Sequence, residues 1–315
     1  MLLSSCSDEK VPSYNSELLV NCSDNGFAVC SEDLVFYTDS FKVGFYHLSE
    51  GIETSQVAIR DPFYKTEENN IIGLFSKNKD VYYLMDNSDG YEVRVIHTGD
   101  FSSEVIYTDT YQKDVDENKF MGISVSYYTR PEDIDRLNCF WIDGHNLWLL
   151  YDSGVYSYSL KSKEKKLVIS QSIYNKCISY YGGYIFYVDN SLNLHRYTIK
   201  TDTDYVFENI AVTNIAILSD RIFYIDACGG LIYETDFYGE NTRQITDHAA
   251  VSISLTDDYL LYGDEYLNLH SLNLETGKEK LISDNAEKVC AITDSKVIYA
   301  FLNNDRYEFA ECDLE

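Results

Sequence analysis

The sequence predicts an all-β protein built from a repeated unit, and three observations carry this prediction. Seven short hydrophobic runs recur along the 315 residues, with their third residues at positions 37, 83, 150, 187, 224, 262 and 299. Four of the six intervals are 37 or 38 residues, a period typical of propellers, solenoids and other arrays. No helical period is sustained, and the three prolines lie outside the repeats, as expected where strands are dense.

The fifth repeat shows the unit most clearly. Residues 214–220 and 221–226 read as two hydrophobic strands, and the second is apolar on consecutive residues, as in a strand covered on both faces. Turn residues at 228–230 lead to a third strand, 231–236, and a turn at 239–241 leads to a more polar fourth strand, 242–246. Four antiparallel strands that become more polar towards the outside make one propeller blade.

Two columns of residues keep their phase from repeat to repeat. Aspartates end the second strand of six repeats: Asp39, Asp86, Asp152, Asp189, Asp226 and Asp264. Their simplest role is to accept hydrogen bonds from turn N–H groups, and the alternative is a carboxylate ring that holds cations. Glycines fall in third-to-fourth-strand turns, where we expect positive φ: Gly51, Gly99, Gly239 and Gly277. We therefore expect a seven-bladed β-propeller, with six blades as the alternative.

The last repeat lacks a fourth strand, which N-terminal residues can supply. The repeat ends with a third strand at 307–313, and residues 18–25 match the fourth strand of the sixth repeat at 280–285. Placing residues 18–25 in the last blade would close the ring and remove an open strand edge. We therefore expect deletion of residues 16–24 to destabilise the whole ring.

The chain divides into an N-terminal tether, residues 1–15, and one propeller domain, residues 16–315. Two intervals exceed the common period, by about 9 and about 30 residues, which places insertions at 60–70 and 109–137. Both fall between the fourth strand of one blade and the first strand of the next, on the face that carries the repeated aspartates. Because binding usually resides in loops on a rigid scaffold, we expect the insertions to form one recognition wall.

The tether contains a motif for lipid attachment. Leu3-Ser4-Ser5-Cys6 fits a bacterial lipobox, in which small residues precede a cysteine that becomes acylated. Only Met1 and Leu2 precede it here, whereas a complete signal has a basic start and an apolar stretch. We expect an extracellular lipoprotein anchored to the membrane through Cys6, and the alternative is a cytoplasmic protein in which the match is chance.

Charge and cysteine spacing narrow the range of ligands. The net charge of −27 opposes binding to nucleic acid and to anionic membrane surfaces, which leaves a lipid anchor as the expected membrane contact. The eight cysteines form no CxxC pair; Cys177 reads as a small core residue, and a disulfide between Cys22 and Cys30 stays open. Residues 114–118 begin like a calcium loop, but Lys119 stands where glycine is expected. We expect no metal and no cofactor.

The fifth repeat resembles a known type of propeller repeat. The segments that carry the likeness are Arg221-Ile222-Phe223-Tyr224-Ile225-Asp226, Leu231-Ile232-Tyr233 and residues 236–246. They resemble the YWTD-type repeat of low-density-lipoprotein receptors, and more closely the bacterial domain-of-unknown-function propellers that share this pattern. The resemblance covers residues 16–315 and implies a propeller at the cell surface, without catalytic residues to carry over. It departs from the receptors in count, because their rings have six blades.

The candidate recognition residues lie in the two insertions: Phe63, Tyr64, Tyr111, Tyr127, Tyr128 and Arg130. Aromatic residues in inserted loops have less reason to be buried than those within repeats, and tyrosine and arginine are typical anchors of protein and sugar-binding surfaces. We expect these residues to bind a protein, a peptide or a glycan; the alternative is that their rings belong to the core.

The sequence contains none of the common catalytic motifs, such as GxSxG, HExxH or a P-loop. His47, His195 and His270 recur in or near third strands, so the repeat itself accounts for them, and the lysines at 161–166 read as a solvated turn. The favoured function is therefore a monomeric, non-catalytic binding or scaffold module. The alternative is a polysaccharide hydrolase or lyase that gathers single residues from several blades around a central channel.

Overall fold

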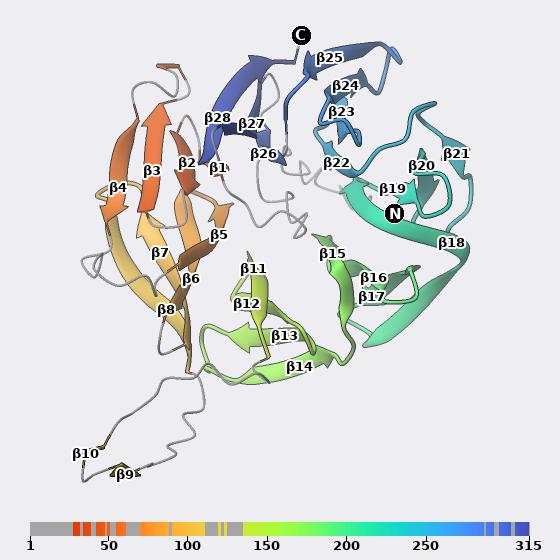
Figure 1. The fold of residues 1–315 in the computed structure, drawn as a ribbon. Coiled ribbons are helices and arrows are strands. Elements are labelled where there is room, and N and C mark those ends of the chain that lie inside the picture. Colours follow the sequence, from red (N-terminus) through yellow and green to blue (C-terminus); the bar gives the residue numbers. More distant parts are fainter. Residues whose placement is uncertain are drawn as a thin grey trace, which may run out of the picture.

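A computed structural model describes residues 28–31, 34–38, 42–47, 49–50, 55–60, 70–87, 90–110, 119–120, 123–124, 135–286, 288–292, 296–303 and 306–314. Within these ranges the chain forms strands and turns and no helix (Figure 1). Consequently, none of the described residues belongs to a helix long and apolar enough to cross a membrane. The all-β fold predicted from the sequence is confirmed.

Consecutive strands pair antiparallel as meanders, and the described residues form six sheets of three or more strands and one two-stranded hairpin. The first two sheets are β1 (Ala28–Ser31), β2 (Leu34–Thr38), β3 (Lys42–His47) and β4 (Gln56–Arg60), then β5 (Asn70–Lys77), β6 (Asp80–Asn87), β7 (Gly90–His97) and β8 (Ser102–Thr110). The hairpin is β9 (Lys119–Phe120) and β10 (Ile123–Ser124), and the third sheet is β11 (Leu137–Asp143), β12 (Asn146–Tyr151), β13 (Gly154–Ser159) and β14 (Lys165–Ile169).

The next sheet has seven strands because one long strand belongs to two meanders. Its strands are β15 (Ile173–Tyr181), β16 (Tyr184–Asp189), β17 (Asn193–Thr198), β18 (Thr203–Leu218), β19 (Arg221–Asp226), β20 (Ile232–Asp236) and β21 (Arg243–Gln244). The N-terminal part of β18 pairs with β17 and its C-terminal part with β19, so β15–β18 form the fourth meander of the chain and β18–β21 the fifth. The sequence predicts a separate first strand from residue 214, but neither Gly nor Pro interrupts residues 203–218, so the strand continues from one meander into the next.

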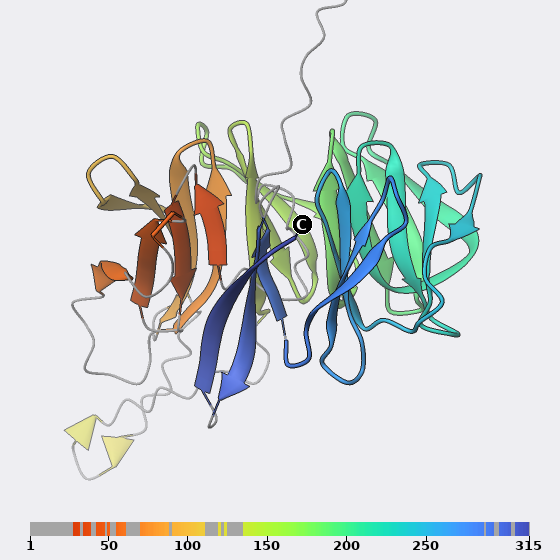
Figure 2. The ribbon, with the colours of Figure 1, turned by 90° about the horizontal axis from the view of Figure 1, so that it is seen from above.

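Two sheets complete the described chain. They are β22 (Ser252–Leu255), β23 (Tyr259–Gly263), β24 (Leu269–Asn273) and β25 (Glu279–Ser283), followed by the three-stranded sheet β26 (Lys288–Ile292), β27 (Lys296–Asn303) and β28 (Arg306–Asp313). Figure 1 draws the sheets one after another around a common centre, and Figure 2 shows the same sheets from above. The first and last sheets touch: β1 contacts β26, and the Tyr37 and Phe309 rings lie 5.4 Å apart.

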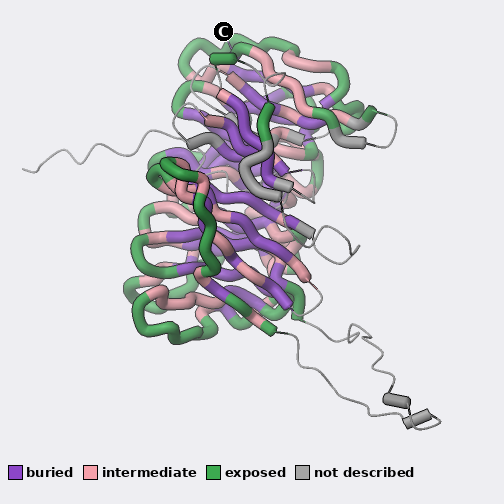
Figure 3. Tube along the Cα trace, turned by 90° about the vertical axis from the view of Figure 1, so that its left-hand side faces the viewer, coloured by how far each residue is buried: buried purple, intermediate pink, exposed green. Residues whose placement is uncertain are grey.

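In the second to sixth meanders burial declines from the second strand to the fourth, as the sequence predicts. In β12, β16, β19 and β23, consecutive side chains are buried, because each second strand is covered on both faces. The fourth strands β14 and β25 are mostly exposed. Figure 3 shows the buried segments inside the molecule and the exposed turns at its surface. The cores lie between neighbouring sheets; one joins Leu84 and Val93 of the second sheet to Trp141 and Trp148 of the third and Tyr187 of the fourth.

Most turn predictions hold, with one correction. Gly239 and Gly277 adopt positive φ of 81° and 69°. Gly99 does not; in its turn Phe101 takes the left-handed conformation instead, at φ 56°. Gly51 lies outside the described residues. Cys177 is buried, as predicted for a core cysteine, and the Cys22–Cys30 pair cannot be placed because Cys22 lies outside the described residues.

Several predicted features fall on residues that the structure does not describe. These are the tether 1–15, the closing strand 18–25, residues 61–69 of the first insertion, and residues 111–118, 121–122 and 125–134 of the second. The described chain places the first insertion between β4 and β5, and the second between β8 and β11 with β9 and β10 inside it. Each insertion therefore connects one four-stranded sheet to the next.

Candidate functional site

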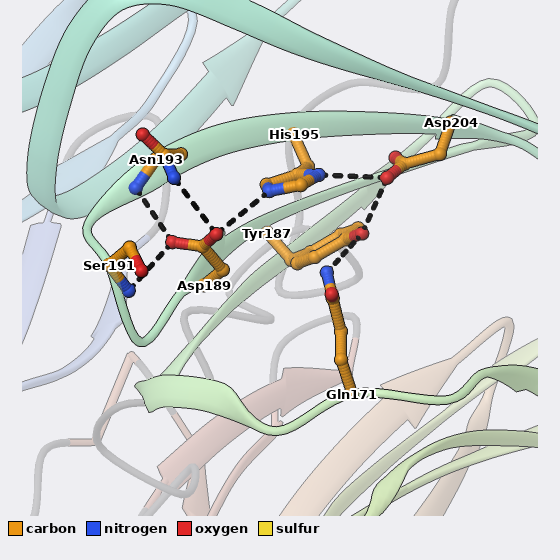
Figure 4. Close-up of polar contacts among 7 residues, drawn as sticks. All are labelled: Gln171, Tyr187, Asp189, Ser191, Asn193, His195 and Asp204. Carbon is orange, nitrogen blue, oxygen red and sulfur yellow. Dashed lines mark hydrogen bonds and ion pairs between the residues drawn. The ribbon is translucent and has the colours of Figure 1, made fainter.

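In the fourth to sixth meanders the repeated aspartate holds the turn between the second and third strands, whereas Asp152 of the third accepts a hydrogen bond from Asn138 Nδ2 of β11. Asp189 Oδ1 accepts hydrogen bonds from the backbone N–H groups of Ser191 and Asn193, both at 2.8 Å, and Oδ2 accepts one from Asn193 Nδ2 at 3.0 Å (Figure 4). Asp226 accepts from two backbone N–H groups in the same way, at 3.0 and 2.7 Å. The structural role predicted for these aspartates is therefore confirmed in both turns.

In the fourth meander the turn aspartate also reaches a buried histidine. Tyr187 of β16 and His195 of β17 are paired across the strands, and their rings stack with centroids 4.5 Å apart at 16°. His195 Nδ1 lies 2.8 Å from Asp204 Oδ2, and His195 Nε2 lies 3.3 Å from Asp189 Oδ2 (Figure 4). The Tyr187 hydroxyl donates to Asp204 at 2.9 Å and accepts from Gln171 Nε2 at 2.6 Å.

This geometry fixes the charge of His195. A carboxylate faces each ring nitrogen, and only the imidazolium donates from both. Burial opposes the charge, but the hydrogen bonds and charges of Asp204 and Asp189 outweigh it and raise the pKa of His195. Burial, followed by the charge of Asp204, raises the pKa of Tyr187, so its hydroxyl stays a neutral donor. Neither side chain is prepared to accept a proton from a substrate.

The sixth meander repeats the stacked ring pair and the histidine contacts, but its buried Tyr262 hydroxyl has no hydrogen-bond partner among the described residues. Tyr262 of β23 and His270 of β24 stack with centroids 4.9 Å apart at 6°. His270 Nε2 lies 3.8 Å from Asp264 Oδ2, and Nδ1 lies 3.0 Å from Glu279 Oε1. Asp264 is itself a turn aspartate, and despite partial burial its hydrogen bonds from Asn268 and Tyr266 lower its pKa. We call the sets Tyr187, Asp189, His195, Asp204 and Tyr262, Asp264, His270, Glu279 the two histidine–carboxylate clusters.

Of the three histidines that recur in or near third strands, two belong to these clusters and one does not. His195 and His270 occupy equivalent positions opposite a second-strand tyrosine, but His47 does not, because Tyr37 lies opposite Gly44 and His47 lies opposite Leu34. The carboxylates on the fourth strand were not predicted, since their approach depends on strand register. The signal available in the sequence was a second-strand tyrosine, an aspartate two residues later and a histidine eight residues later.

A second polar cluster includes one lysine of the lysine-rich turn. Lys165 Nζ donates to Asp109 Oδ2 at 2.8 Å and lies 4.2 Å from the centroid of the Tyr151 ring. The hydroxyls of Tyr151 and Tyr107 also donate to Asp109. Lys165 therefore ties β14 of the third sheet to β8 of the second, because a cation above aromatic rings satisfies a half-buried carboxylate. All four lysines, Lys161, Lys163, Lys165 and Lys166, are exposed, as predicted for a solvated turn.

None of the predicted recognition residues can be placed. Phe63, Tyr64, Tyr111, Tyr127, Tyr128, Arg130 and Cys6 all lie outside the described residues. The same holds for the calcium-like segment 114–118. Within the part of the chain that the structure describes, no group of three or more His, Cys, Asp or Glu side chains could hold a metal ion. In the first histidine–carboxylate cluster this follows from the geometry, because the two carboxylates approach different nitrogens of the ring.

Comparison with known proteins supports the fold. No family model matches the sequence, and no curated protein matches it either. Among solved structures, that of YCF48 bound to D1 peptide is similar at a TM-score of 0.61, with 9% identity over 88% of this chain and 89% of that chain. A chain of the mitotic checkpoint complex has a TM-score of 0.59, with 10% identity over 98% of this chain and 95% of that chain.

A chain of the nidogen/laminin complex is similar at a TM-score of 0.50, with 12% identity over 78% of this chain and 90% of that chain. YCF48 and nidogen are β-propeller proteins, and the resemblance to propeller repeats noted in the sequence is confirmed at that level. At such low identity the likeness concerns the fold alone: this chain has a β-propeller fold.

Proposed function

We propose that this protein is a non-catalytic β-propeller that binds a partner through the face carrying its second-to-third-strand turns. The observation that carries the proposal is the state of the two histidine–carboxylate clusters. Each histidine pairs with carboxylates inside its blade, and the aspartate of each pair also holds a turn in place instead of facing a substrate. A rigid scaffold that presents loops is the usual architecture of a binding module.

The similar structures support a protein or peptide as the partner. They are structures of YCF48 bound to D1 peptide, of a complex of nidogen with laminin, and of a mitotic checkpoint complex. A glycan is a further class of partner, because tyrosine rings on a protein surface can stack against sugars. We also propose that the protein acts at the cell surface as a lipoprotein attached through Cys6. Replacing Cys6 with Ser should then move the protein from the membrane fraction to the soluble fraction; retention in the membrane fraction would contradict the anchor.

We propose that the ring has seven blades and is closed by residues 18–25. Counting β18 in two meanders divides the larger sheets into seven, of which only β26–β28 has three described strands. Among the described residues β28 pairs with β27 alone, and its Phe309, Ala310 and Cys312 are only half-buried. Such an edge favours pairing with a further strand. Deletion of residues 16–24 should lower the melting temperature of the whole protein, and an unchanged melting temperature would refute closure.

The recognition wall would contain Phe63, Tyr64, Tyr111, Tyr127, Tyr128 and Arg130. The described residues at both ends of the second insertion support a defined base for it. Asp109 is held by Lys165 and Tyr151 at one end. At the other end Asp135 accepts hydrogen bonds from the Ser153 N–H at 2.9 Å and from its hydroxyl. Both ends are therefore fixed to side chains or turns of the third sheet.

The test is capture of a partner by the folded chain, compared with a variant in which residues 111–134 are replaced by a short Gly-Ser linker. This replacement keeps Asp109 and Asp135, so the base stays intact. A second variant, Tyr127→Ala/Tyr128→Ala, should lose capture while its stability stays within about 1 kcal/mol of the intact protein, as for surface sites. Equal capture by all three proteins would refute the wall. Release of reducing ends from polysaccharide by the intact chain would instead favour a hydrolase or lyase.

A further inference from the structure

Three exposed apolar side chains lie on the β23–β24 turn of the sixth meander and on the adjoining end of the connection from β21 to β22. Tyr266 is 73% exposed, Val251 60% and Leu267 40%. They belong to one hydrogen-bonded unit: the Val251 N–H donates to the Gly263 carbonyl at 2.8 Å, and the carboxylate of Asp264 accepts from the Tyr266 N–H at 2.8 Å. Large apolar side chains that cluster on a surface mark interaction sites more often than scattered ones do.

The backbone at Leu267 is strained. Leu267 adopts φ 66°, in the left-handed region that leucine rarely occupies. The equivalent residue of the fifth meander is Gly230, at φ 70°, and that of the fourth is Leu192, also at φ 66° but half-buried. Burial helps to offset the strain at Leu192, whereas Leu267 leaves much of its side chain in water. Strain of this kind, at an exposed apolar side chain, is typical of a site that contacts a ligand.

The charge around this turn has one sign. The second-to-third-strand turns and the inter-sheet connections of the fourth to sixth meanders are residues 188–192, 209–213, 226–231, 247–252, 264–268 and 284–286. They contain six carboxylates and neither Lys nor Arg: Asp189, Asp226, Asp247, Asp264, Glu265 and Asp284. The turns at the opposite ends of the same strands carry Lys200 and Lys278 among their carboxylates, which are Asp202, Asp220, Glu240, Asp257, Asp258 and Glu275. The face that carries Tyr266 is therefore complementary to a cationic partner.

We infer that the Val251–Tyr266–Leu267 surface docks a basic segment of a partner protein that presents an aromatic or aliphatic side chain. This inference rests on the proposed binding function and names the partner's chemistry. Apolar contact with Tyr266 and Leu267 would anchor the segment, and the surrounding carboxylates would attract its lysines or arginines. Asp264 accepts from the N–H groups of Tyr266 and Asn268 and from Asn268 Nδ2, so the turn is ordered before binding and loses little entropy.

The test uses a fluorescein-labelled twelve-residue peptide of lysine and serine with one central tryptophan, and fluorescence anisotropy as the readout. Replacing the tryptophan with serine should weaken binding about tenfold or more, and replacing the lysines with glutamate should abolish it. Raising the salt from 50 to 500 mM should also weaken binding, because the contacts between charges are solvent-exposed.

Two variants of the full chain locate the site. Tyr266→Ala should weaken binding of the tryptophan peptide about tenfold or more, as expected for an aromatic anchor. The matched control is Tyr238→Ala, which removes a tyrosine that is 68% exposed on the opposite face and should change the affinity less than about threefold. Equal losses in the two variants would show diffuse attraction between charges and would overturn the inference.

A third variant separates docking from folding. Leu267→Gly removes the apolar side chain at a backbone angle that glycine adopts without strain, so the melting temperature should stay within about 3 °C of the intact protein. Binding of the tryptophan peptide should nevertheless weaken. Unchanged binding would overturn the inference. Absence of peptide binding by the intact chain would overturn it too, while loss of partner capture on replacement of residues 111–134 would still support the proposed function.

Discussion

His195 offers the sharpest test of how the blades are held together. In the variant His195→Phe, an aromatic ring of similar shape remains opposite Tyr187, but it has no hydrogen-bond donor and no charge. The change therefore removes the contacts to Asp204 at 2.8 Å and Asp189 at 3.3 Å while keeping most of the ring packing. Any loss of stability then measures mainly the pairing of one cation with two carboxylates.

The structure sets the expected size of this loss. A hydrogen bond to a charged group contributes roughly 1.5–3 kcal/mol, but the two bonds here are unequal. Asp204 is 36% exposed, so water replaces part of its lost partner, and Asp189 keeps three hydrogen bonds from Ser191 and Asn193. We expect the variant to be less stable by roughly 2 kcal/mol at pH 6. This value lies in the lower part of the range for one such bond, because the contact to Asp204 is partly exposed and the contact to Asp189 is long.

The loss should depend on pH in a defined direction. The pKa of His195 is raised in the folded protein, so its pairing stabilises the fold fully below the pKa of the unfolded state, about 6.5. That stabilisation is lost as the pH rises through the folded pKa. The stability difference between intact protein and variant should therefore be larger at pH 6 than at pH 9. Urea unfolding followed by the fluorescence of Trp141 and Trp148, which are buried and stacked at 5.7 Å, measures both values.

A control removes ambiguity about other titrating groups. His145 lies exposed in the β11–β12 turn, so His145→Gln should leave the unfolding midpoint unchanged at both pH values. If His195→Phe destabilised the protein equally at pH 6 and pH 9, the proposed charge pairing would be wrong. A larger loss at pH 9 than at pH 6 would contradict it as well, because the sign of the linkage would be reversed.

Three further predictions test other parts of the fold. Gly154→Ala places a Cβ 2.0 Å from the Ile169 carbonyl oxygen at φ 145°, and should lower the stability by roughly 2–4 kcal/mol, seen as an earlier urea midpoint. In native protein, iodoacetamide should label the exposed Cys228, whereas Cys177, whose burial raises its thiol pKa to about 12, should react only after unfolding, as read by mass spectrometry. Lys165→Met keeps the stem over the tyrosine rings but removes the ammonium, and should lower the melting temperature through a loss of about 1–2 kcal/mol; an unchanged value would show that the carboxylate of β8 is satisfied by water.

The sequence was sufficient for features that depend on local pattern. Runs such as 185–189 and 222–226 are apolar on consecutive residues because both faces of a second strand are covered, and the structure has strands at Tyr184–Asp189 and Arg221–Asp226. The turn role of Asp189 was predictable for the same reason, since an aspartate hydrogen-bonds backbone groups two residues further along. These interactions lie within a few residues, so composition and spacing determine them.

Features that depend on register were beyond the sequence. His47 and His195 both lie on third strands, yet only His195 falls opposite a second-strand tyrosine, because the first and fourth meanders differ in where the third strand begins to pair. The contact between Lys165 and Asp109 joins residues of two different sheets, 56 positions apart. A sequence pattern identifies such residues as a charged turn and a strand end, but their approach is set by how neighbouring blades pack.

The turn aspartate of the sixth meander connects the docking surface to the interior of the blade. The carboxylate of Asp264 holds the turn that presents Tyr266, and the same group lies 3.8 Å from His270 inside the blade. The fifth meander has a tyrosine pair, Tyr224 and Tyr233, in place of tyrosine and histidine, and its turn ends in glycines without an exposed apolar residue. In a meander with a histidine–carboxylate cluster, the aspartate thus binds the N–H groups of its turn and also the histidine of the third strand. Such a turn can hold a strained Leu267 in place, and an ordered turn is what a docking surface needs in order to bind at low entropic cost.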